Sequence, residues 1–235
     1  MESPATDLRL ATLGKATAPS ATEQVFDALH SALVTLDLPP GTKVSEAEIA
    51  RQLDVSRQPV RDAFFRLSKL GFLEIRPQRA TLITKISTAA VRQAAFIRIA
   101  LEIACIRAAT ARATAADIAR LDDNLARQRE AVDENDRSRF HSLDDGFHSL
   151  ICATAGHGYV WPLIEDYKAH MDRVRYLTLM TDTELVFGQH RDILAAIASG
   201  DAEAGETRMR SHLSRIEQIL NDVRRDHAQY FEDVS

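Results

Sequence analysis

The sequence predicts a mainly α-helical protein of two parts, a small N-terminal unit that ends in a two-stranded ribbon and a C-terminal antiparallel bundle of about six helices. Two observations carry this prediction. Apolar residues recur at steps of three and four along most of the chain, which is the spacing of an amphipathic helix. Alternation typical of strands is confined to residues 72–84, where a basic turn interrupts it.

Size and composition exclude several classes of protein. The chain has 235 residues, of which 45% are hydrophobic and 27% charged, as in an ordinary globular protein. The longest apolar run is residues 193–198, far short of the ~20 residues that span a bilayer, so we expect no membrane partner. Cys105 and Cys152 are widely spaced, and the N-terminus lacks the pattern of a signal peptide. These features predict a cytoplasmic location.

Charge is distributed unevenly along the chain. The formal net charge is −5, which by itself disfavours a nucleic-acid partner. Residues 51–85, however, hold eight basic against three acidic residues, whereas residues 86–235 hold 18 against 24. A basic segment joined to an acidic body predicts that residues 51–85 contact nucleic acid.

The first helix is predicted to follow a disordered arm. Residues 1–21 are rich in Ala, Thr, Ser and Pro and show no period. From Thr22, a fair N-cap, apolar residues recur on one face through residues 25–36. Residues 38–41 read LPPG and end this helix, because proline has no N–H to donate and glycine permits a turn.

Two further helices are predicted between residues 45 and 71. Ser45 and Glu48 form an S-x-x-E capping box at the start of the second helix. Ser56 is expected to cap the third, with Pro59 in its first turn, where the missing N–H is harmless. Gly71 ends this third helix.

The ribbon completes the N-terminal unit. Residues 72–75 and 81–84 are predicted strands, joined by a turn at 76–80. Three helices followed by a two-stranded ribbon have the order of a winged helix-turn-helix, which we therefore predict over residues 22–85.

An all-helical region is predicted over residues 91–226, between a linker at 86–90 and a tail at 227–235. Short separators between its helices imply antiparallel neighbours in a bundle. The predicted helical stretches are 88–112, 116–133, 136–155, 158–180, 183–199 and 201–225.

The third helix carries the predicted DNA contacts. Arg57 and Arg61 are four residues apart and share the face opposite the apolar stripe. Arginine binds guanine edges or phosphate, and the N-terminal end of a recognition helix is the part that reaches the bases. A solvated basic face is the alternative. The predicted contact residues are Ser56, Arg57, Gln58, Arg61 and Arg66, with Gln78 and Arg79 at the ribbon tip.

These residues resemble a known family. Residues 56–63 read SRQPVRDA, followed by RL at 66–67 and GFL at 71–73, and are similar to the pattern S-R-x-P-V-R-E-A-L-x-R-L…G-L-V of GntR-family transcriptional regulators. Residues 38–46, LPPGTKVSE, resemble that family's L-x-P-G-x-x-L-x-E. One departure is Ala80, where the family more often has glycine. The resemblance implies a homodimeric regulator that reads a pseudo-palindromic operator in double-stranded DNA.

Four residues of the helical region form a candidate metal site. Asp144 and His148 lie four apart on one predicted helix, and His190 and His212 lie on two later ones. Antiparallel packing can bring His190 and His212 to one level of the bundle. One carboxylate and three imidazoles suit Zn²⁺, our first choice, and also Ni²⁺, Mn²⁺ or Fe²⁺. Whether Asp145 or His141 takes part stays open.

The helical region also resembles a known domain. It is similar to the FCD effector domain of the FadR subfamily, whose pattern D-x-x-x-H…H…H matches the four residues above and so implies a metal site. In that domain the arginine of R-x-x-L-E faces the effector cavity. The resemblance therefore implies that Arg98, with Glu102, binds a small organic acid that controls operator affinity. A surface ion pair between these two residues is the alternative reading.

Two rival functions remain at this point. A metal-dependent enzyme would use the same ligands, but the sequence has no P-loop, nucleophile elbow or HExxH motif, so we do not expect catalysis. A DNA-binding protein whose metal is purely structural is the other alternative.

Overall fold

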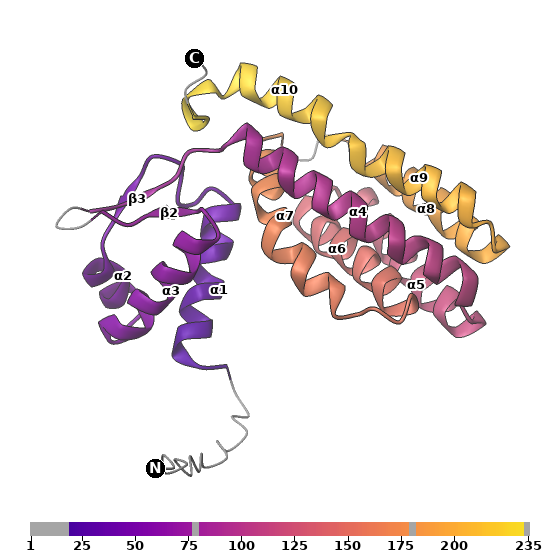
Figure 1. Cartoon of the computed structure of the whole chain (residues 1–235), viewed down its shortest axis with the longest axis horizontal. Coiled ribbons are helices and arrows are strands. Elements are labelled where there is room, and N and C mark those ends of the chain that lie inside the picture. Colours follow the sequence, from indigo (N-terminus) through magenta and orange to yellow (C-terminus); the bar gives the residue numbers. More distant parts are fainter. Residues whose placement is uncertain (1–18, 77–79, 179–181, 233–235) are drawn as a thin grey trace, which may run out of the picture.

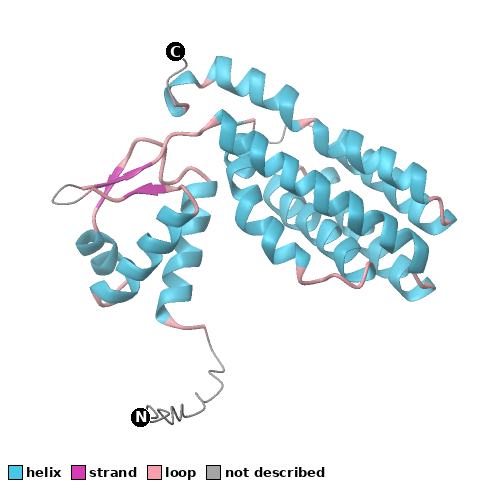
Figure 2. Ribbon diagram, viewed as in Figure 1, coloured by secondary structure: helices cyan, strands magenta, loops and turns pink. Residues whose placement is uncertain are grey.

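The computed structural model describes residues 19–76, 80–178 and 182–232. It is mainly helical with one small sheet, and the predicted fold class is confirmed (Figures 1 and 2). The described residues 19–84 form an N-terminal unit, and residues 88–232 form a helical unit beside it. Of the arm predicted over residues 1–21, residues 1–18 lie outside the described residues, and Ala21 belongs to the first helix rather than to an arm. Residues 77–79 of the predicted ribbon turn also lie outside the described residues.

The first helix, α1 (Ala21–Val34), begins earlier than predicted. Its N-cap is Ser20, whose hydroxyl accepts from the backbone N–H of Glu23 while the Glu23 carboxylate accepts from that of Ser20. Thr22 lies inside the helix, so its predicted capping role is wrong. The reciprocal capping box satisfies two backbone donors, which a threonine two residues later cannot reach.

The next two helices are α2 (Glu46–Gln52) and α3 (Arg57–Lys69). Ser45 caps α2 by accepting from the N–H of Glu48. Ser56 holds the N-cap position of α3, but its side chain makes no capping bond, so the predicted cap is wrong in that respect. Gly71, at φ +83°, turns the chain after α3 in a conformation that favours glycine.

A three-stranded antiparallel sheet packs beside these helices. Its strands are β1 (Lys43–Val44), β2 (Leu73–Glu74) and β3 (Thr81–Ile83), in the order β1-β3-β2. The ribbon strands are shorter than predicted. The sequence did not predict β1, because two residues are too few to show alternation.

The helical unit contains seven helices in the described part of the chain. The expected helix at 201–225 is broken at Arg215 into two helices, of which the second runs toward the N-terminal unit (Figure 1). The helices are α4 (Thr88–Arg112), α5 (Ala115–Asp133), α6 (Arg137–Thr154), α7 (Val160–Leu177), α8 (Thr183–Ser199), α9 (Ala202–Ser214) and α10 (Ile216–Asp226). None of the helices described is both long and apolar enough to cross a membrane.

The connection between the two units is short and packed. Ile86 is fully buried, and its N–H donates to the Tyr230 carbonyl at 2.8 Å while its carbonyl accepts from the Glu232 N–H at 3.1 Å. Phe231 is buried beside it. The described part of the predicted tail is therefore bound to the predicted linker, and α4 already begins at Thr88.

Candidate functional site

The outer face of α3 is basic and accessible. Val60, Phe64 and Leu67 are buried beneath it, and the predicted contact residues on the other side are exposed. Arg61 pairs with Glu46 of α2 at 3.3 Å, whereas Arg57 has no side-chain partner in the described chain. The first turn of α3 thus presents guanidinium groups to solvent, as a recognition helix requires.

The other predicted DNA-contacting residues have varied surroundings. Gln58 donates to Asp62 at 2.9 Å. The Arg66 guanidinium stacks over the ring of Phe26, 3.8 Å from its centroid. Gln78 and Arg79 lie outside the described residues, and their predicted contact stays a prediction.

The four candidate metal ligands meet in the core of the helical unit. Asp144 and His148 come from α6, His190 from α8 and His212 from α9, and their donor atoms all lie within 4.8 Å of one another. We call these four residues the histidine cluster. The Nε2 atoms of His148 and His212 are 3.2 Å apart, and Nε2 of His190 is 3.5 Å from Oδ1 of Asp144. All four side chains are at most 9% exposed.

Each imidazole of the cluster is held through its Nδ1 atom. His148 Nδ1 contacts the Glu102 carboxylate, His190 Nδ1 lies 2.9 Å from Gln128 Oε1, and His212 Nδ1 lies 2.9 Å from Gln189 Oε1. Because oxygen acceptors of this kind cannot donate, each Nδ1 carries the proton and each Nε2 presents a lone pair. Sequence patterns singled out neither glutamine.

The orientation of Gln128 follows from its other partners. Its amide nitrogen donates to Asn124 Oδ1 at 2.8 Å and to the Leu143 carbonyl at 3.4 Å. The amide oxygen is therefore the atom that faces His190, which fixes the tautomer of that ring. Asn124 and Gln128 are four residues apart and both lie on the buried face of α5.

The donor set fits a metal cation. Two lone pairs face each other between His148 and His212, and His190 Nε2 and Asp144 Oδ1 are buried without a hydrogen-bond partner among the described residues. Donors bound to zinc at 2.0–2.1 Å lie roughly 3.3 Å apart in a tetrahedron. The His148–His212 and His190–Asp144 separations, 3.2 and 3.5 Å, are close to this value. Buried nitrogen lone pairs and a carboxylate oxygen that face one another without a donor are costly unless a cation joins them.

The protonation states of the cluster agree with this interpretation. Burial lowers the pKa of His190 to about 3, against the opposing effect of Asp144. Burial, with help from the neighbouring imidazoles, also holds the pKa of His212 well below its usual value. Burial opposes ionisation of Asp144, but Arg175 and His190 hold its pKa well below the usual range. Neutral imidazoles and an ionised carboxylate are the forms that bind metals.

A cavity of about 110 Å³ adjoins the histidine cluster. Arg98, Arg175, Arg215 and His212 line it, with Met171 among its apolar wall residues. Nη2 of Arg98 is buried and has no partner in the described structure, while its Nε donates to Glu102 at 2.6 Å. The cavity thus joins a candidate metal site to an arrangement of guanidinium groups suited to an anion.

Glu102 lies behind the cluster. It contacts Arg98 and His148 and is not among the residues that line the cavity, so its predicted contact with an effector stays a prediction. Burial opposes its ionisation, yet His148 and Arg98 hold its pKa at about 2. Glu102 is therefore an anion that orients one imidazole and one guanidinium.

The two alternative ligands lie next to Asp144. One donor atom each of His141, Asp144 and Asp145 also lie within 4.8 Å of one another. Asp145 pairs with Lys168 of α7 at 2.8 Å, and Lys168 also pairs with Asp172. These contacts link Asp145 to α7. Its binding to a metal remains an untested alternative.

Comparison with known proteins identifies the two domains of the chain. Residues 93–215 match the model of the FCD domain, and residues 21–83 match that of bacterial regulatory proteins of the gntR family. The chain resembles an HTH-type transcriptional regulator, YdfH, of Escherichia coli O6:H1, with 37% identity over 217 residues, 92% of this chain and 95% of that protein. It also resembles the HTH-type transcriptional repressor RspR of Escherichia coli K12, with 37% identity over 213 residues, 90% and 93% of the two chains.

Two solved structures share the fold. Escherichia coli McbR/YncC has a TM-score of 0.75 at 22% identity and covers 87% of this chain and 99% of its own. A GntR transcriptional regulator from Rhodococcus sp. RHA1 has a TM-score of 0.66 at 23% identity, covering 85% and 97%. The chain belongs to the GntR family of bacterial transcriptional regulators and carries an FCD domain after its DNA-binding unit.

Proposed function

We propose that this transcriptional regulator binds its operator with an affinity set by a small organic acid that occupies the cavity beside a divalent metal ion. The observation that carries the proposal is the convergence of three Nε2 atoms with Oδ1 of Asp144, which has no hydrogen-bond partner among the described residues, beside an arginine-lined cavity that His212 also lines. A ligand that prefers one arrangement of the protein shifts DNA affinity by its differential affinity for the two arrangements.

Operator contact is assigned to the exposed face of α3. Arg57, Gln58 and Arg61 would reach base edges or phosphates in the major groove, and Arg66 would contact the backbone. The Ser56 hydroxyl makes no capping bond and is free for a phosphate. The tip residues Gln78 and Arg79 would contact an adjacent groove. Two copies of the chain would read the two halves of a pseudo-palindrome.

The metal is assigned to the histidine cluster. Asp144, His148, His190 and His212 would hold it, with Zn²⁺ as first choice and Ni²⁺, Mn²⁺ or Fe²⁺ also suited to this donor set. When bound, the ion supplies positive charge at the cavity wall. The chain itself provides the orientation, through Glu102, Gln128 and Gln189.

The effector is assigned to the adjoining cavity. Arg98 offers an unpaired N–H group there, and Arg175 and Arg215 add two further guanidinium groups. Three guanidinium groups and one carboxylate, Asp182, line a space of about 110 Å³, and Arg215 pairs with Asp182 at 3.2 Å. The excess of positive charge favours a small acid, with Met171 contacting its apolar part.

The test uses the purified full-length protein and a duplex that it selects from a random-sequence library. Elemental analysis is expected to find one metal per chain in the unaltered protein and in the exposed-loop control His157→Ala, and none in the double variant His190→Ala/His212→Ala. A thermal-shift screen of small organic acids then identifies an effector, because a ligand that binds only the folded state raises the melting temperature.

The effector is next added to the protein–duplex complex. We expect operator affinity to change by at least about fivefold, the lower end of allosteric coupling, and the change to vanish in the double variant. Metal retained by the double variant contradicts the ligand assignment. An acid that raises the melting temperature but leaves operator affinity unchanged contradicts effector control.

A further inference from the structure

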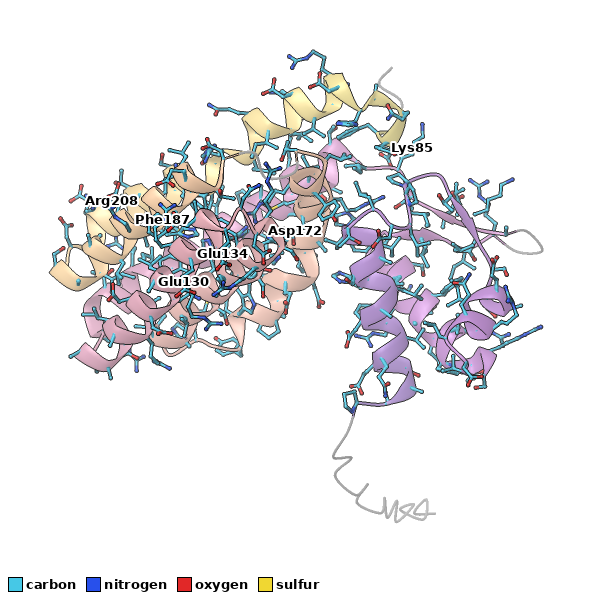
Figure 3. The ribbon with its side chains drawn as sticks, turned by 180° about the vertical axis from the view of Figure 1, so that it is seen from behind. Lys85, Glu130, Glu134, Asp172, Phe187 and Arg208 are labelled. Carbon is cyan, nitrogen blue, oxygen red and sulfur yellow. The ribbon has the colours of Figure 1, made fainter. Side chains whose placement is uncertain are left out.

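Helix α7 connects the histidine cluster to the recognition helix. It is the helix of the bundle that lies beside α1, and its residue Ala169 belongs to the apolar core of the N-terminal unit (Figure 1). Figure 3 shows Asp172 of α7 on the side of the helical unit that faces the N-terminal unit. The two sides of α7 therefore contact different functional parts of the protein.

His170 contacts the C-terminal end of α3. Its Nε2 lies 2.7 Å from the carbonyl oxygen of Leu70, the C-cap residue of α3, and must donate because a carbonyl only accepts. Its ring stacks on Phe72, with centroids 4.3 Å apart. A residue of the helical unit thus satisfies a backbone acceptor at the end of the recognition helix.

Arg173 makes a second contact one turn further along α7. It is fully buried, and its Nη2 donates to the Thr84 carbonyl at 2.8 Å. Thr84 in turn donates through its hydroxyl to the Gly71 carbonyl at 2.6 Å, so both contacts reach the turn after α3. Nε and Nη1 of Arg173 have no hydrogen-bond partner among the residues described.

The buried guanidinium of Arg173 is only partly paired, with one hydrogen bond to Thr84. A buried cation with one hydrogen bond repays only part of the cost of leaving water. The two units are therefore joined by the His170 and Arg173 contacts as well as by the apolar packing of Ala169.

That other side of α7 is tied to the histidine cluster. Arg175 Nη2 lies 3.2 Å from Oδ2 of Asp144, whose Oδ1 faces the cluster, and Arg175 Nη1 lies 3.7 Å from Asp172. Lys168 pairs with both Asp172 and Asp145. The Asp144 carboxylate is therefore linked through Arg175 to α7, the helix that also contacts the end of α3.

We propose that His170 and Arg173 are positioning residues for operator recognition, which fix the direction of α3 relative to the histidine cluster. Through these two residues, a change at Asp144 on metal binding reaches α3. This inference rests on the proposed function, since it needs both a bound operator and an occupied cluster. The inference adds the route by which the histidine cluster and operator binding are coupled.

The first test compares variants at position 170 in the zinc-loaded full-length protein. His170→Phe keeps the ring on Phe72 but removes the donor, and His170→Gln keeps a donor. For a duplex selected by the unaltered protein, we expect His170→Phe to lower affinity about three- to tenfold, the effect of one hydrogen bond. We expect His170→Gln to recover most of this loss, and zinc content to be unchanged in both.

Arg173 is tested in the same assay. Arg173→Ala is expected to lower affinity as His170→Phe does, and Arg173→Lys, which keeps a donor for Thr84, to lower it less. The control is His157→Phe, at an exposed loop histidine, which should bind the duplex like the unaltered protein. Wild-type affinity in both His170→Phe and Arg173→Ala overturns the inference.

The second test measures coupling without DNA. Amide exchange in the peptide covering residues 66–72 is followed with zinc bound and after chelation. We expect faster exchange after chelation in the unaltered protein, and fast exchange in both states of His170→Phe. Equal exchange in the two states of the unaltered protein overturns the coupling. Failure to select a duplex or to bind zinc contradicts the proposed function itself, and the inference falls with it.

Discussion

The proton on each clustered imidazole is placed by a residue outside the predicted ligand set. The histidine cluster itself could be predicted, since Asp144 and His148 share a helix face and the family pattern extends to His190 and His212. Gln128 and Gln189 could not. A glutamine on a helix is ordinary at any surface position, and only the packing of α5 against α6 and α8 makes Gln128 a buried acceptor.

The role of Gln128 leads to a prediction about metal affinity. Gln128→Leu keeps the size of the side chain but removes the oxygen that accepts from His190 Nδ1. We expect zinc affinity to fall about 10- to 100-fold, the usual cost of losing a partner that orients a ligand. Competition with a chromophoric chelator measures this. Gln93→Leu, at an exposed position of α4, is the matched control. Unchanged zinc affinity in Gln128→Leu would show that packing alone holds the ring.

Helices could be predicted from the sequence where a short local pattern, such as a capping box or an apolar stripe, marks them. The start of α1 was predicted too late, although Ser20 and Glu23 form the same S-x-x-E pattern that located α2. The apolar stripe begins at Val25, and this favoured Thr22 as the N-cap. The break at Arg215 leaves the apolar spacing intact, since Leu213, Ile216 and Leu220 continue it. A break that preserves the period is invisible to a periodicity argument.

At the level of α3, we predict unequal effects of two arginines. Arg57→Ala is expected to cost about 1–3 kcal/mol of specific binding, as for a base-edge contact, because Arg57 is exposed and without a side-chain partner in the described chain. Arg61 must first leave Glu46, so Arg61→Ala is expected to cost less. Gel shifts at fixed salt with the selected duplex measure both, and Lys69→Ala in the last turn is the control. Equal losses for Arg57→Ala and Lys69→Ala would remove the first turn of α3 from the recognition surface.

The arrangement of the two units is a property of the whole molecule that the sequence did not indicate. Lys168, Asp172 and Arg173 are charged residues of α7, yet all three are buried. They are buried because α7 packs against both units, a fact that no local pattern encodes. In the same way, Ile86 and Phe231 form a β-bridge although the whole helical unit lies between them in the sequence. A pattern within either segment alone does not reveal this pairing.

The contact between the units is expected to weaken in mild acid. Burial lowers the pKa of His170, with smaller contributions from Arg173 and His30 and opposition from the Leu70 carbonyl. Burial also lowers the pKa of His30, whose ring stacks on Phe26. Separated units would let both imidazoles return to their usual pKa of 6.5 and bind more protons than in contact. The charged groups that face His30 are Asp172, Lys168, Asp166 and Asp27.

The contact should therefore be fully stable above pH 6.5 and lose stability as the pH falls through the lowered pKa values, by at most ~1.4 kcal/mol per pH unit for each imidazole. Amide exchange in residues 66–72, corrected for the intrinsic rate between pH 7.5 and 5.5, measures this, with a peptide from α5 as internal reference. The double variant His30→Phe/His170→Phe lacks both titrating groups. It should exchange faster at every pH but with a flatter dependence, because only the slope reports protonation. An equally steep slope in the double variant would contradict this prediction, because neither His30 nor His170 would then account for the acid sensitivity.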